Sequence, residues 1–106
     1  GMYDTWHTLT LFEQLGNAGS DYERALRWKI KGQHQLFLNA FARTLDQIDL
    51  TLADHRWAGP RRREIARLRE EVCRELSVKQ VHTASAHQLQ RYFMCFATAA
   101  RKSVGI

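Results

Sequence analysis

The stretch from residue 12 to residue 53 reads FEQLGNAGSDYERALRWKIKGQHQLFLNAFARTLDQIDLTLA, and its apolar residues recur at the spacing of helices. In the first half of this stretch, the residues that fall on one face of a helix are Phe12, Leu15, Gly16, Gly19, Tyr22, Leu26 and Ile30. This face runs unbroken through the glycines, so we predict one continuous helix over residues 8–31. Thr10 and Glu13 have the spacing of a capping box, and Ser20 and Glu23 repeat it, so a break near Gly16 and Gly19 is the alternative. In a continuous helix, the two glycines allow another helix to approach closely.

Gly32 marks the end of this helix, since Lys29 and Lys31 just before it suit the negative end of the helix dipole. A second helix is predicted over residues 33–53. Its core stripe recurs at spacings of four and three: Phe37, Phe41, Leu45, Ile48 and Leu52. Because the join at Gly32 is so short, we expect the two helices to form an antiparallel hairpin.

Residues 54–60, DHRWAGP, break the periodicity and contain glycine and proline, which predicts a loop. Pro60 suits the first turn of a third helix over residues 61–76. The apolar stripe of this helix is narrow and consists of Ile65, Leu68, Val72 and Leu76.

A polar connection follows, and Ser85 with Gln88 forms a capping box that opens a fourth helix over residues 85–102. The residues expected to face inward are Leu89, Phe93, Phe96 and Ala100. The predicted fold is therefore all-α: a four-helix bundle with up-down-up-down topology, in a single domain over residues 1–106.

The composition of the 106 residues is typical of globular proteins, with 44% apolar and 25% charged residues and a single proline. No run approaches the ~18 consecutive apolar residues of a membrane-spanning helix, and no signal peptide is recognisable. Cys73 and Cys95 lie in helical patterns without metal-ligand spacing, so we expect buried thiols in a reducing compartment, by default the cytoplasm. We expect no metal site, no cofactor and no membrane partner.

The net charge of +5 is concentrated in the C-terminal half. Five arginines of the third helix are candidates for binding an anion or nucleic acid: Arg61, Arg62, Arg63, Arg67 and Arg74. The alternative is an ordinary solvated face, in which Arg67 pairs with Glu71 and Arg74 pairs with Glu70. No aromatic residue alternates with the arginines to stack on bases, which favours the solvated face.

Arg27 and His34 have a spacing that is similar to the Arg-x(4–6)-His pattern of HEPN-type helical ribonucleases. In such a pair, the arginine stabilises the charge of a phosphorane-like state while the histidine transfers a proton. The pair straddles a predicted turn, and Trp28 follows Arg27 where that family prefers a polar residue. Arg27 and His34 are therefore the catalytic candidates, and the alternative is a structural His34 near the edge of the core.

Trp28 is predicted to project opposite the apolar face of the first helix, beside Gln14 and Asp21. A tryptophan on a polar face indicates a partner surface, since tryptophan is enriched in interface hot spots. Alternatively, the 54–60 loop with Trp57 folds over it. Met94 also points away from the core face of its helix, so the interface candidates are Trp28, Trp57 and Met94.

Three strings of the chain resemble a small family of uncharacterised bacterial proteins: ALRWKIKG (25–32), FARTLDQIDLTLAD (41–54) and RRREIARLREEV (61–72). The resemblance is most distinctive at Trp28, Asp49, Asp54 and Arg67, and we expect the two aspartates to cap or to pair with arginines of the third helix. It implies a helical bundle distantly similar to HEPN domains and to substrate-binding subunits of minimal nucleotidyltransferases. The chain lacks the Arg-Asn-x-x-x-His type of signature of those modules.

The leading functional hypothesis is a non-enzymatic protein-interaction module that self-associates, since no catalytic constellation is recognisable in the sequence. The alternative is a nucleic-acid-binding protein or HEPN-like ribonuclease, with Arg27 and His34 as its catalytic pair. A weaker alternative is a helical partner subunit of a nucleotidyltransferase.

Overall fold

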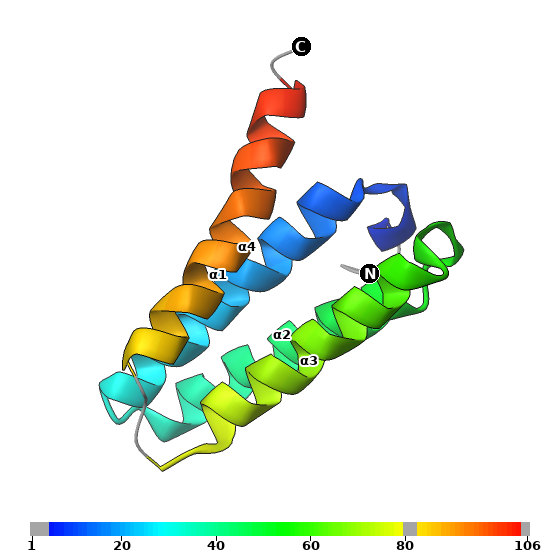
Figure 1. The fold of residues 1–106 in the computed structure, drawn as a ribbon. Helices are drawn as coiled ribbons and strands as arrows, with labels where there is room; N and C mark the ends of the chain where they lie inside the picture. Colours follow the sequence, from blue (N-terminus) through cyan, green and yellow to red (C-terminus); the bar gives the residue numbers. More distant parts are fainter. Residues whose placement is uncertain (1–4, 80–82, 105–106) are drawn as a thin grey trace.

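The computed structural model describes residues 5–79 and 83–104, and every regular element in these two ranges is helical. In chain order these elements are η1 (Trp6–Thr8), α1 (Leu11–Ile30), α2 (His34–Leu52), η2 (His55–Trp57), α3 (Pro60–Ser77) and α4 (Thr83–Val104). Successive α-helices run in opposite directions (Figure 1). The prediction of an all-α four-helix bundle with up-down-up-down topology is confirmed. No helix in the described ranges is long and apolar enough to cross a membrane.

The start of α1 is set by a capping box. The Thr10 hydroxyl accepts a hydrogen bond from the Glu13 backbone N–H at 3.1 Å, and the Glu13 carboxylate accepts one from the Thr10 N–H at 2.9 Å. The helix therefore begins at Leu11, later than the predicted residue 8, and η1 precedes it. It continues without a break through Gly16 and Gly19, as predicted.

The two glycines of α1 bring it into close contact with α4. A Cβ atom on Gly19 would lie 2.5 Å from the Phe93 Cβ, and one on Gly16 would lie 3.1 Å from the Ala97 Cα. The predicted close approach of another helix is therefore confirmed, and that helix is α4.

The turn between α1 and α2 is a Schellman motif. Gly32 adopts φ +72°, its N–H donates to the Lys29 carbonyl at 3.2 Å, and the Gln33 N–H donates to the Trp28 carbonyl at 2.9 Å. Glycine adopts a positive φ without strain. The predicted antiparallel hairpin follows, and α1 with α2 forms the most extensive helix pair of the molecule.

The second face of α1 is buried as well, which differs from the prediction. Gln14 and Asp21, expected on a polar outer face, are fully or almost fully buried: Gln14 bonds to Trp6 of η1 and Trp57 of η2, and Asp21 pairs with Arg43 of α2. Ile30, expected at the end of the core face, is 68% exposed. Helix α1 is thus enclosed by α2 on one side and α4 on the other (Figure 1).

The face of α2 that is buried is not the face that carries most of its large apolar residues. Phe37 and Ile48 are buried as predicted, but Phe41, Leu45 and Leu52 are only partly buried and pack at the edge of the core. Their place is taken by small and polar residues that are also buried: Ala40, Thr44, Gln47 and Thr51. The threonines fit there because their hydroxyls donate to carbonyls one turn earlier, Thr44 to Ala40 at 2.8 Å and Thr51 to Gln47 at 2.9 Å.

Helix α3 begins at Pro60, which follows Gly59 at φ +85°. Its predicted apolar stripe is buried along its whole length: Ile65, Leu68, Val72 and Leu76. Helix α4 begins at Thr83, two residues before the predicted cap Ser85, and Leu89 and Phe93 enter the core. The predicted polar connection falls partly on residues 80–82, outside the described ranges. Of the neighbouring helix pairs, α3 and α4 touch the least.

Candidate functional site

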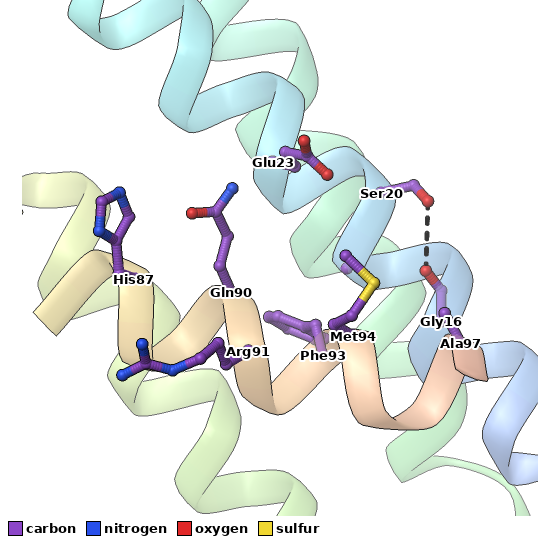
Figure 2. A pocket seen from close by; sticks show the side chains of 10 residues that line it. Gly16, Ser20, Glu23, His87, Gln90, Arg91, Phe93, Met94 and Ala97 are labelled. Carbon is purple, nitrogen blue, oxygen red and sulfur yellow. Dashed lines mark hydrogen bonds between the residues drawn. The ribbon is translucent and has the colours of Figure 1, made fainter. Parts of the chain in front are cut away.

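A groove of about 520 Å³ runs between α1 and α4, beside the close contact that Gly16 and Gly19 make with Ala97 and Phe93 (Figure 2). Its apolar lining comes from Gly16 and Gly19 of α1 and from Phe93, Met94 and Ala97 of α4. Without side chains on the glycines, the groove reaches down to the backbone of α1. Such an apolar hollow can accept a side chain from a partner.

The rim of the groove is polar. Ser20 and Glu23 stand on α1, and His87, Gln90 and Arg91 stand on α4 (Figure 2). The Ser20 hydroxyl donates to the Gly16 carbonyl at 3.3 Å, so it is satisfied by its own helix. Glu23 forms an ion pair with Arg27 at 3.6 Å. The rim therefore combines one paired carboxylate with two basic side chains, His87 and Arg91.

Met94 is the most prominent apolar side chain of this groove. It is 54% exposed and extends from α4 towards α1, beside Gly16 and Ser20 (Figure 2). Its neighbour Cys95 is exposed, contrary to the prediction of a buried thiol, because it lies on the outer side of α4. A flexible thioether at the mouth of an apolar groove suits contact with a partner surface.

The two tryptophans predicted as interface residues have structural contacts. Trp28 is partly buried against the core, and the Lys31 ammonium lies 5.6 Å from its ring centroid. Trp57 is partly buried too, and its indole N–H donates to the Gln14 side chain at 2.8 Å. Because Gln14 lies about 21 Å along α1 from Trp28, the 54–60 loop does not cover Trp28.

Asp54 organises the chain between α2 and α3. Its buried carboxylate accepts hydrogen bonds from the Arg56 guanidinium at 2.6 Å and from the Gln14 amide at 3.0 Å. His7 also lies 3.4 Å away. The hydrogen bonds from Arg56 outweigh the desolvation of the carboxyl and hold the pKa of Asp54 far below its ordinary value. The predicted capping role of Asp54 is present, since the carboxylate also accepts from the Arg56 backbone N–H at 3.1 Å, but its arginine comes from η2.

Asp49 forms the pair with α3 that was expected, through an arginine not singled out from the sequence. The Arg69 guanidinium donates to both carboxylate oxygens of Asp49, at 2.6 and 3.3 Å. This bidentate pair joins α2 to α3. Arg69 has no distinctive sequence signal, because its role depends on the register between two helices.

Arg27 and His34 are both exposed and have different neighbours. Arg27 pairs with Glu23, and the His34 ring lies 6.3 Å from the Phe37 ring. The structure records no hydrogen bond or ion pair between Arg27 and His34 in the part of the chain that it describes. His34 is exposed, but it lies beside the core, since Phe37 of the same first turn of α2 is buried.

The five arginines of α3 that were predicted as anion-binding candidates are exposed, and, among the described residues, neither of the two ion pairs expected within the helix forms. Arg61 pairs with Glu64 at 3.8 Å. Within the described ranges, neither Arg67 with Glu71 nor Arg74 with Glu70 forms an ion pair. Arg67 and Arg74 therefore keep their charge available to a partner.

Tyr92 of α4 is the residue of this surface that the sequence did not reveal. With Arg63 and Arg67 it lines a hollow of about 580 Å³ between α3 and α4, to which Glu64 and Glu71 also contribute. The Tyr92 hydroxyl donates to Glu64 at 2.6 Å, and burial, followed by this bond, raises the pKa of Tyr92 above its ordinary value. The sequence shows no aromatic residue among the arginines because this one arrives from another helix.

No group of three or more His, Cys, Asp or Glu side chains that could hold a metal ion occurs within residues 5–79 and 83–104. Comparison of the chain with protein-family models, with curated proteins and with solved structures finds no match.

Proposed function

We propose that the protein is a non-enzymatic interaction module that self-associates through the groove between α1 and α4. The observation that carries the proposal is Met94, a large apolar side chain that is 54% exposed at an apolar groove. Exposed apolar surface with a polar rim is typical of protein–protein contacts.

Further apolar surface adjoins the groove. Phe12 of α1 is 39% exposed, and its ring packs 6.1 Å from the Phe96 ring of α4. Phe12, Phe96 and Met94 thus present apolar atoms from both helices that form the groove. A second copy of the chain offers the same surface, and symmetric pairing of equal patches is the commonest way for proteins to form dimers.

The two cysteines support a reducing compartment as the place of action. Cys73 is a free, partly buried thiol and Cys95 is a free, exposed one. An exposed free thiol is stable in the cytoplasm and oxidises readily outside it. We therefore assign the module to the cytoplasm, in line with the resemblance to bacterial proteins.

The test is the molar mass of the protein in solution, measured by light scattering over a range of concentrations. The wild type should change from the mass of one chain to that of two as concentration rises. Met94→Glu should stay at the mass of one chain, because it places a charge in the apolar contact. Leu38→Glu is the matched control, since Leu38 is 41% exposed on α2, away from the groove. A wild type that keeps the mass of one chain throughout contradicts the proposal, as does a Met94→Glu variant that dimerises like Leu38→Glu.

Cys95 provides a second measurement of the same contact. It follows Met94 on the exposed side of α4, so mild oxidation should cross-link two copies if their α4 helices meet. Cys95→Ser should abolish the cross-link, and Cys73→Ser should leave it intact. Cross-linking through Cys73 alone would place the contact elsewhere.

A further inference from the structure

The outward face of α3 carries three arginines in one line. Arg63, Arg67 and Arg74 lie opposite the buried stripe of the helix, because spacings of four and seven residues return to nearly the same side. Their Cα atoms span about 17 Å along the helix axis. We call Arg63, Arg67 and Arg74 the arginine row.

The charges of the arginine row are not neutralised by carboxylates of the same helix. In the described ranges, the ion pairs of α3 are Arg61 with Glu64 and Arg69 with Asp49, and neither includes a member of the row. Glu70 and Glu71 stand on the same helix without forming ion pairs with the row. Unpaired guanidinium groups on a rigid helix are good donors to phosphate oxygens.

An aromatic ring lies beside the row. Tyr92 lines the hollow between α3 and α4 together with Arg63 and Arg67, and the ring is only partly buried. The Tyr92 ring is held by edge-to-face packing against Phe96 and Phe93, with ring centroids 5.1 and 6.5 Å apart, and its hydroxyl donates to Glu64. Aromatic rings next to a basic groove bind single strands by stacking on their bases.

Arginines and carboxylates line the hollow together. Arg63 and Arg67 of the row lie beside Glu64 and Glu71, while Arg74 lines a second hollow that Tyr92 also borders. A strand can therefore place its phosphates on the row and a base in the hollow, where carboxylates accept hydrogen bonds from base amino groups.

We propose that the arginine row and Tyr92 form a binding surface for single-stranded nucleic acid. This surface lies on α3 and on the side of α4 that faces α3, whereas the proposed dimer contact lies between α4 and α1. The two surfaces use different residues and adjoin where the Tyr92 ring packs 5.1 Å from the Phe96 ring. A duplex fits less well, because its bases are stacked on each other and are not available to Tyr92.

The experiment measures fluorescence anisotropy of labelled twelve-nucleotide RNA and DNA strands, and of the matching duplexes, at several salt concentrations. We expect the single strands to bind at low salt and to lose affinity steeply as salt rises, since each phosphate contact contributes a slope of about −0.7 in log–log form. The triple variant Arg63→Gln, Arg67→Gln, Arg74→Gln should lower the slope by about 2 and weaken binding at least about tenfold.

Matched variants test whether binding depends on the arginine row itself or only on the positive charge of the helix. Arg62 is exposed on the same helix but points to another side, so Arg62→Gln should have a smaller effect than Arg67→Gln. For the ring, Tyr92→Phe should keep affinity within about twofold, while Tyr92→Leu should lose about fivefold or more. Circular dichroism and thermal unfolding of each variant confirm that it is folded.

The proposal is overturned by any of three results. The first is that single strands do not bind at low salt. The second is that Arg62→Gln and Arg67→Gln weaken binding equally. The third is that the protein binds polyglutamate, used as a competitor, as tightly as it binds the oligonucleotide. RNA and DNA strands that bind alike would support recognition through phosphate and base, and tighter RNA binding would add contacts to the 2′-hydroxyl. Duplex binding equal to that of the single strands would remove the role assigned to Tyr92.

Discussion

Gln14 joins three segments of the chain through one buried amide. Its nitrogen donates to the Trp6 carbonyl at 2.8 Å and to Asp54 at 3.0 Å, while its oxygen accepts from the Trp57 indole at 2.8 Å. The amide thus ties η1 and η2 to α1. Because the Gln14 amide is fully buried, water cannot replace a bond that it loses, and the cluster is therefore strongly interdependent.

Asp54 is the charged member of this cluster, and its replacement tests the cluster directly. We expect Asp54→Asn to lower the free energy of unfolding at neutral pH by about 2 kcal/mol, since hydrogen bonds to a charged group are replaced by weaker ones. Urea unfolding of both proteins measures this. Asp46→Asn, an exposed aspartate on α2, is the control and should stay within about 0.5 kcal/mol of the wild type.

The same substitution has a pH dependence with a definite sign. The pKa of Asp54 is lowered in the folded protein, so its stabilisation is present above the unfolded pKa of about 3.9 and is lost as the pH falls below it. The difference between wild type and Asp54→Asn should therefore shrink as the pH falls from 5 towards 2. A difference that stays constant over this range would contradict the role given to the carboxylate.

Buried polar residues were the part of the molecule that the sequence predicted least well. By helical periodicity Gln14 and Asp21 lie on the polar side of α1, yet both are buried: η1 and η2 cover Gln14, and Arg43 of α2 pairs with Asp21. Polar residues at helical spacing predict a face exposed to solvent, unless the buried groups that bind them are known. The partners, Asp54 and Arg43 among them, lie far away in the chain.

At the scale of elements, the contact between α1 and α4 depends on the absence of a side chain. We expect Gly19→Ala to destabilise the protein by about 1–3 kcal/mol, because its Cβ would lie 2.5 Å from the Phe93 Cβ and α4 would have to move. The higher helix propensity of alanine, about 1 kcal/mol, opposes this effect but does not exceed it. Thermal unfolding provides the measurement.

Asn17→Ala is the control for Gly19→Ala. Asn17 is exposed on α1 between the two glycines, so alanine there changes helix propensity and little else. A Gly19→Ala protein that is as stable as Asn17→Ala would show that a methyl group at this position does not clash with α4.

The helices themselves were predictable because local signals set their ends. Gly32 ends α1 and Pro60 begins α3 through their own backbone conformations. The buried residues of α3 were predictable because that helix has only one apolar face. The prediction of which α2 residues are buried was less accurate, since Phe41 and Leu45 are only partly buried at the edge of the core. Of the site, Met94 and the arginines could be identified from spacing, whereas Tyr92 and Arg69 could not, because they depend on how two helices lie side by side.

At the scale of the whole molecule, packing is uneven. Helix α1 has α2 and α4 on two sides, while α3 and α4 touch each other little (Figure 1). Local stability follows the number of neighbours that must separate before an amide is exposed. We therefore expect amide hydrogen exchange in native conditions to be slowest in the middle of α1, around Tyr22, and faster throughout α3 and α4.

Mass spectrometry of deuterium uptake distinguishes these helices. Peptides from α1 should retain protons longest, and those from the last turns of α4 should exchange first. Equal protection of α1 and α3 would mean that the bundle opens as one unit, in spite of the loose contact between α3 and α4.

The densest helix pair is also the first that the ribosome completes. Helices α1 and α2 are joined by a three-residue turn, Lys31–Gln33, so closing them together costs little chain entropy. They can pair while the residues of α4 are still inside the exit tunnel, and the nascent chain then displays the bare glycine face of α1 until α4 emerges. During synthesis, this face is where a chaperone or a neighbouring nascent chain would bind.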